Sequence, residues 1–139
     1  MLRVHRISSL LSASFIGALS VVLLFTAPVV AQAPDAAAHK QWMNDSSDAQ
    51  EDFRFALTDK DQKAAAEALA KLEALMAKTG EYWTTKKAAD GAKLSRDARD
   101  LAAQAGAAVK AGNIAAAQEA FDKMGATCNT CHELHLEKR

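Results

Sequence analysis

Apolar residues recur every three or four positions through most of the chain after residue 34, which is the spacing of one face of an α-helix. The pattern is strongest near the C-terminus, where the steps are 3, 4, 3, 4 and 3 along Ile114, Ala117, Phe121, Met124, Cys128 and Cys131. The alternation of apolar and polar residues that is typical of strands is missing. The sequence therefore predicts an all-α protein.

Polar residues that favour helix N-termini stand directly before two of the periodic segments. They are Asp61 and Asn113. The first helix is expected to run from 35–37 to 57, and the last is expected to follow Asn113.

The second helix is expected to end at Lys78, with Gly80 as its terminator. The third is expected to begin near Glu81 or Asp90 and to end at 110–112. The connections are then short: 58–61, 79–80 and 111–113. Short connections join antiparallel neighbours, so we expect an up-down-up-down four-helix bundle.

The same periodicity predicts which residues of the first three helices face inward. They are Trp42 with Met43, Ser46, Ala49, Phe53 and Ala56; Ala65, Leu69, Leu72 and Met76; and Leu94, Ala98, Leu101, Ala105 and Ala108. Alanine occurs 32 times and aromatic residues make up 6% of the chain, so this core is thin for its size. Zero net charge predicts no nucleic-acid binding.

Residues 1–31 have the order of a secretory signal peptide. Arg3 and Arg6 precede an apolar run, and small residues end it at Val29-Val30-Ala31. We expect cleavage after Ala31, a periplasmic mature domain 32–139 with net charge −2, and no membrane span in it. An uncleaved membrane anchor is the alternative, disfavoured by Pro28 and by the marginal apolar length.

Cys128-Asn129-Thr130-Cys131-His132 is a C-x-x-C-H sequence, the attachment signature of c-type haem. In such a site two thiols add across the haem vinyl groups, and the adjacent histidine becomes an axial ligand of the iron. The motif predicts one covalent haem c, with Cys128 and Cys131 as thioethers and His132 on the iron.

Three other uses of this segment are less well supported. Zinc ligands at Cys128, Cys131, His132 and His135 would spread over about 10.5 Å of helix rise, whereas zinc ligands lie about 2.0–2.3 Å from the metal. A thioredoxin-like C-x-x-C needs a preceding strand. A structural disulfide fits the spacing but leaves His132 without a role.

The start of the first helix and the end of the last lie at the same end of such a bundle. A rise of 1.5 Å per residue puts Met43 about 9 Å and His132 about 7.5 Å from that end. Met43 is therefore the candidate sixth ligand, and His–Met ligation is typical of electron-carrying haem. His39, one turn nearer the end, is the reserve candidate, although a solvent-exposed or propionate-facing position is favoured for it.

Several large side chains are expected to form the haem pocket: Trp42, Met76, Trp83 and Met124. Tyr82 and Trp83 are expected to open the third helix, and His135 to lie at the haem edge or on the surface. Because haem would fill a thin core, we expect the haem-free mature chain to fold poorly.

An exported four-helix bundle with Cys128-x-x-Cys131-His132 near its C-terminus resembles the class II cytochromes c, the cytochrome c′ family. The resemblance covers the mature chain in architecture, and its one specific motif is the haem site. It implies either of two sites. Low-spin members have a Met near the start of the first helix on the iron, which Met43 matches. Cytochromes c′ proper have an apolar residue there and a five-coordinate iron that binds NO or CO.

The sequence therefore predicts a periplasmic monohaem cytochrome that carries single electrons between redox partner proteins. It is not expected to be an enzyme, because neither a nucleophile–base pair nor a carboxylate dyad stands out. The alternative is a five-coordinate NO- or CO-binding protein for gas detoxification or sensing. The resemblance also leaves a homodimer open, since dimers occur in the family.

Overall fold

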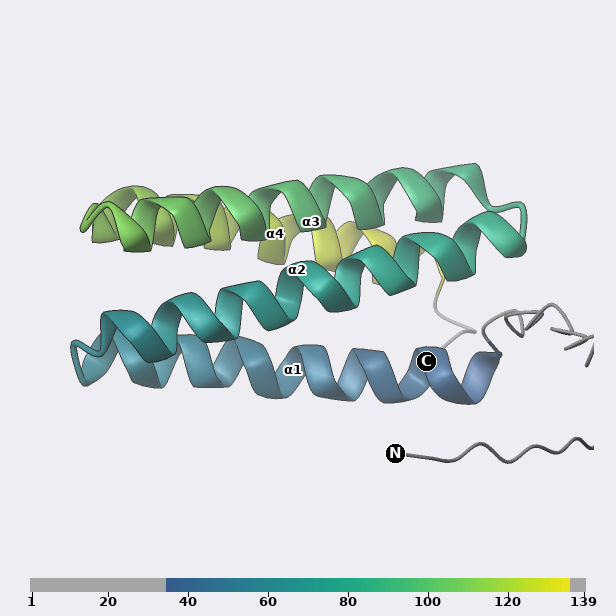
Figure 1. Cartoon of the computed structure of the whole chain (residues 1–139). Coiled ribbons are helices and arrows are strands. Elements are labelled where there is room, and N and C mark those ends of the chain that lie inside the picture. The colour runs from purple at the N-terminus through teal and green to yellow at the C-terminus, as the bar shows by residue number, and fades with distance from the viewer. Residues whose placement is uncertain (1–34, 136–139) are drawn as a thin grey trace, which may run out of the picture. The chain divides into compact units, whose positions relative to one another are not determined.

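The computed structural model describes residues 35–135, and it shows four α-helices and no strand in that range. They are α1 (Ala36–Thr58), α2 (Gln62–Thr85), α3 (Ala89–Lys110) and α4 (Ile114–Leu134) (Figure 1). Each helix packs along the next one in the chain and runs antiparallel to it. The all-α prediction is confirmed for this range, and the arrangement is consistent with the expected bundle. The expected signal peptide and its cleavage site lie outside the described residues.

The two predicted N-caps, Asp61 and Asn113, are confirmed, and the structure adds a third at Asp35. Side-chain oxygens of Asp35, Asp61 and Asn113 accept hydrogen bonds from backbone N–H groups three residues later, at 2.7, 2.9 and 3.1 Å. Each bond satisfies one of the N–H groups that a helix start leaves without a partner. These caps fix the starts of α1, α2 and α4.

The predicted end of the second helix at Lys78 is wrong. α2 continues through Gly80 to Thr85, so Tyr82 and Trp83 belong to its last turns and do not open the third helix. The chain turns at Lys87, which has a φ of 57°, and α3 starts at Ala89, close to the second of the two expected starts. Gly80 lies within α2 and faces α3, where a Cβ would meet the Cβ of Ser95 at 3.6 Å, an ordinary contact distance.

The buried face of α3 also differs from the predicted stripe. Three of its predicted inward residues are only half-buried: Leu94, Leu101 and Ala108. The buried line consists of Ala98, Ala102, Ala105 and Val109. α3 packs against both α2 and α4, so its buried face is turned toward the space between them. Ile114, also predicted to face inward, is 37% exposed at the first residue of α4.

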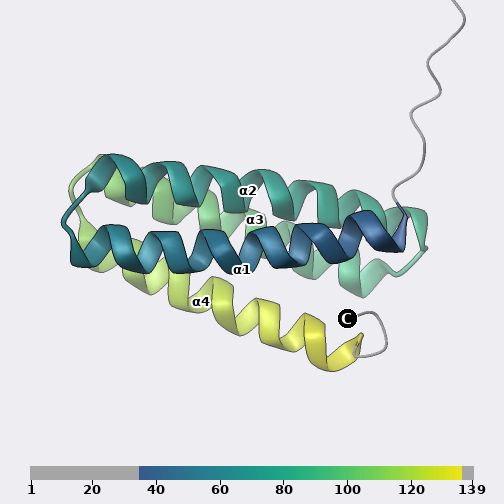
Figure 2. The same cartoon turned by 90° about the horizontal axis from the view of Figure 1, so that it is seen from below.

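α1 and α4 approach each other at one end of the bundle and diverge toward the other (Figure 2). At the closed end, the rings of Phe53 on α1 and Phe121 on α4 are buried, with centroids 4.5 Å apart. Large side chains therefore fill this end of the bundle. At the open end, the first turns of α1 and the last turns of α4 leave a space between them.

Candidate functional site

A cavity of about 630 Å³ occupies the open end, between α1 and α4. All four helices contribute to its lining. Six of the residues singled out from the sequence line it: Met43, Met76, Trp83, Cys128, Cys131 and His132. His39, Lys40 and His135 line it as well. The structure thus brings the C-x-x-C-H segment and the first turns of α1 to one cavity.

Two residues expected in the haem pocket lie elsewhere. Met124 is fully buried in the hydrophobic core, and Trp42 packs against that core from a half-buried position. Neither is among the residues that line the cavity. The Lys78 ammonium group lies 5.9 Å from the centroid of a Trp42 ring.

The α4 wall of the cavity carries both thiols and an imidazole. Cys128, Cys131 and His132 are half-buried, and the cysteines do not form a disulfide. Burial, reinforced by the neighbouring Cys131, raises the pKa of the Cys128 thiol to about 11. Burial and then the charge of Asp90 raise the pKa of Cys131. Both thiols are therefore protonated at neutral pH, the opposite of the lowered pKa that activates redox cysteines.

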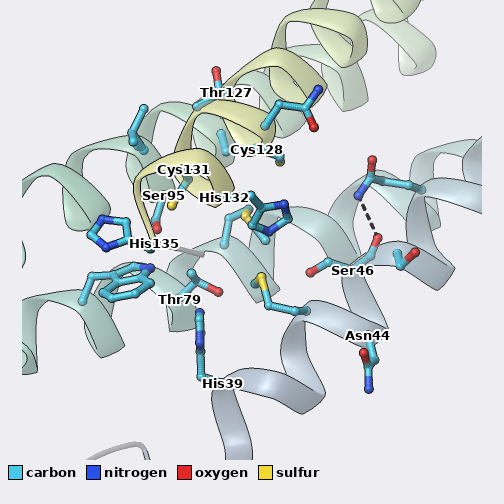
Figure 3. A pocket seen from close by; sticks show the side chains of 18 of the residues that line it. His39, Asn44, Ser46, Thr79, Ser95, Thr127, Cys128, Cys131, His132 and His135 are labelled. Atoms are coloured by element: carbon cyan, nitrogen blue, oxygen red, sulfur yellow. Dashed lines mark hydrogen bonds between the residues drawn. The ribbon is translucent and has the colours of Figure 1, made fainter. Parts of the chain in front are cut away.

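The α1 wall carries His39, whose ring is only 4% exposed. This imidazole stacks on Tyr82 with ring centroids 4.1 Å apart and meets the ring of Trp83 edge-on at 5.2 Å. Burial, followed by the positive charge of His132, lowers the pKa of His39, so the ring is neutral at pH 7. The solvent-exposed position considered for His39 is wrong. His39 and His132 extend from α1 and α4 into the space between these helices (Figure 3).

Met43 lies one turn after His39 on the same wall and is half-buried. The wall is regular helix here, and the Ser46 hydroxyl donates a 2.7 Å hydrogen bond to the carbonyl of Trp42. The predicted candidates for the sixth ligand, Met43 and His39, therefore both reach the cavity that His132 lines.

Trp83 and His135 lie together in the lining of the cavity, with ring centroids 4.3 Å apart. The indole lies directly on Gly91, where a Cβ would come within 2.7 Å of it. The Nε2 atom of His135 is 3.3 Å from Asp90 Oδ2 but lacks the geometry of a hydrogen bond. His135 thus lines the cavity and is not a plain surface residue.

The alternative zinc site is not formed. Within residues 35–135, His, Cys, Asp and Glu side chains nowhere gather in threes in a way that could hold a metal ion. None of the described helices combines the length and the apolarity needed to cross a membrane. Comparison with protein-family models, curated proteins and solved structures finds no match to this chain.

Proposed function

We propose that this chain is an exported, periplasmic c-type cytochrome that carries single electrons between redox partner proteins. One observation carries the proposal: the C-x-x-C-H segment forms one wall of a 630 Å³ cavity, and Met43 lies on the α1 wall of the same cavity. Sites for small molecules and cofactors have volumes of about 300–1,000 Å³. The motif therefore lies where a cofactor has room, and not on a solvated surface.

The chemistry of the lining also fits a porphyrin. Two protonated thiols and an imidazole come from one helix, which is the donor set for two thioether bonds and one iron ligand. The apolar side chains of Met76, Leu94 and Ala98 line the cavity as well, and they suit a flat apolar ring.

Cys128 and Cys131 would hold haem c covalently. Each thiol adds its sulfur and its proton across a vinyl double bond, so one C–S and one C–H bond form without net oxidation. His132 would bind the iron from α4, and Met43 would bind it from α1, as the sequence predicts. When bound, the haem supplies a one-electron ferric–ferrous couple.

The covalent attachment is tested by producing the full chain in a bacterium that matures c-type cytochromes. We expect haem to stay with the polypeptide on a denaturing gel, in the periplasmic fraction, and its mass to add to that of the mature chain. The Cys128→Ala/Cys131→Ala variant is the control, and it should carry no covalent haem. A wild-type chain that is exported under these conditions without covalent haem would overturn the proposal.

The electron-carrier function is tested by the spin state of the iron. Wild type should give a low-spin spectrum with the weak charge-transfer band of a methionine–iron bond. Met43→Leu should remove that band, whereas Met76→Leu, which changes another methionine of the same cavity, should keep it. A high-spin wild-type spectrum that shifts with CO would contradict the Met43 assignment and favour the NO- or CO-binding alternative.

A further inference from the structure

Three buried nitrogen atoms without hydrogen-bond partners gather in the lining of the cavity. They are His39 Nε2, Trp83 Nε1 and His135 Nε2, and the described residues contain no other buried side-chain nitrogen or oxygen in this condition. All three residues line the same cavity, and the Trp83 ring contacts both imidazoles. We call these three side chains the nitrogen cluster.

Buried polar groups in proteins are nearly always hydrogen-bonded, because an unpaired one destabilises the fold. Three unpaired atoms in one cavity therefore indicate a bound group that pairs with them. The indole Nε1–H is a donor only, and a neutral imidazole can donate from Nε2. A group that pairs with the indole must accordingly present a hydrogen-bond acceptor, and the two imidazoles can donate to the same acceptor.

The charges around the nitrogen cluster favour an anionic acceptor. Among the described residues that line the cavity, Lys40 carries a fixed charge and none is acidic. Lys40 follows His39 directly in α1. His135 Nε2 already has Asp90 Oδ2 at 3.3 Å, whereas His39 Nε2 and Trp83 Nε1 have no hydrogen bond to a carboxylate. An acceptor with negative charge forms the stronger hydrogen bonds with such donors.

The donors are also held in place before anything binds. The His39 ring lies nearly parallel to Tyr82, with an interplanar angle of 4°, and meets Trp83 edge-on. Trp83 is only 3% exposed and rests on Gly91. Donors held in fixed positions in the lining of a cavity are the arrangement that binds a defined polar group.

We propose that His39 and Trp83 donate hydrogen bonds to a propionate carboxylate of the bound haem. His135 lies next to Trp83 at the same site. This inference rests on the proposed function, because haem is the source of the carboxylate. His39 is then a positioning residue that orients the porphyrin in its plane, and the α1 side of the iron is left to Met43.

The test uses the haem-bound protein and the resonance Raman band of propionate bending, whose position reports hydrogen bonding to the carboxylate. We expect the wild-type band at the position of a hydrogen-bonded propionate. In Trp83→Phe and His39→Phe it should shift toward the position of a propionate in water, because phenylalanine keeps an aromatic ring and removes the N–H. The reduction potential should fall in both variants, since the carboxylate charge is less well balanced.

Two further variants make the comparison specific. Trp42→Phe removes the indole N–H of the other tryptophan, which packs against the cluster of Tyr82, Trp83 and Ala92 but does not line the cavity, and should leave the band unchanged. His39→Gln keeps an N–H donor near the original Nε2 position and should restore the band. Circular dichroism of each variant establishes that the helices are intact. If Trp83→Phe does not fold, His39→Phe provides the test of the hydrogen bond by itself.

The outcomes separate this inference from the proposed function. Covalent haem with the same propionate band in wild type, Trp83→Phe and His39→Phe would overturn the inference and leave the cytochrome assignment standing. An equal shift in Trp42→Phe would overturn it too, because the effect would not belong to the cavity. A wild-type chain without covalent haem would overturn both.

Discussion

Gly91→Ala is expected to give a less stable protein than Gly106→Ala, although both replace a glycine of α3 by a better helix former. A Cβ at position 91 would lie 2.7 Å from Cγ and Cδ2 of Trp83, whereas ordinary contacts begin at about 3.4 Å. The indole would therefore have to move by about 0.7 Å. A Cβ at position 106 would instead meet the Leu69 Cβ at 3.7 Å, an ordinary contact distance.

The indole has little freedom to make that movement. Trp83 is buried, and its ring contacts those of His39, Tyr82 and His135. Overpacking a core in this way costs about 1–3 kcal/mol. The gain from replacing a helical glycine, about 1 kcal/mol at most, is common to both variants and largely cancels in their difference. We therefore expect Gly91→Ala to be less stable than Gly106→Ala by about 1–3 kcal/mol.

The measurement is thermal and urea unfolding of both variants and wild type, followed by far-ultraviolet circular dichroism. For a domain of this size, each kcal/mol corresponds to roughly 4–8 °C in the unfolding midpoint. Gly125→Ala provides a second control, since a Cβ there meets nothing within 4 Å. Equal stability of the position 91 and position 106 variants would refute the view that Gly91 holds Trp83 in place.

Two more predictions follow from burial. Phe53→Ala should cost about 3–5 kcal/mol in urea unfolding because its ring is fully buried against Phe121, whereas Phe55→Ala, at a position 61% exposed, should change stability by less than about 0.5 kcal/mol; equal effects would contradict the assigned core. Because the His39 pKa is lowered, the unfolded state binds the proton more readily below about pH 6.5, so the stability of the protein should decrease as the pH decreases. His39→Phe should flatten that fall in the urea midpoint, and an unchanged pH dependence would refute the cause.

The starts of α2 and α4 were predictable because their signals are local. Asp35, Asp61 and Asn113 cap helices through bonds to N–H groups three residues away, so the deciding contact lies within one turn of sequence. The prediction that Gly80 ends the second helix was wrong because it also used only a local signal. A glycine next to a periodic segment favours a helix end locally, but here α2 continues through Gly80 and packs along α3.

The site was predictable in part. The spacing of Cys128, Cys131 and His132 points to one helical face, and the antiparallel arrangement brings Met43 to the same cavity. The burial of His39 was not visible in the sequence. It depends on stacking against Tyr82, which required α2 to continue beyond Gly80. The unpaired nitrogen atoms likewise appear only once three helices are packed together.

The divergence of α1 and α4 turns the space between them into a wedge (Figure 2). In a wedge, a residue's place along one helix sets the width of the gap that its side chain must bridge. One helical turn advances a residue by about 5.4 Å, and Met43 stands one turn nearer the closed end than His39. Under the proposed function, the coordination state of the iron thus depends on register along α1. Moving the ligating residue by one turn along α1 would change the distance that its side chain must span to the iron, while the helices themselves stay the same.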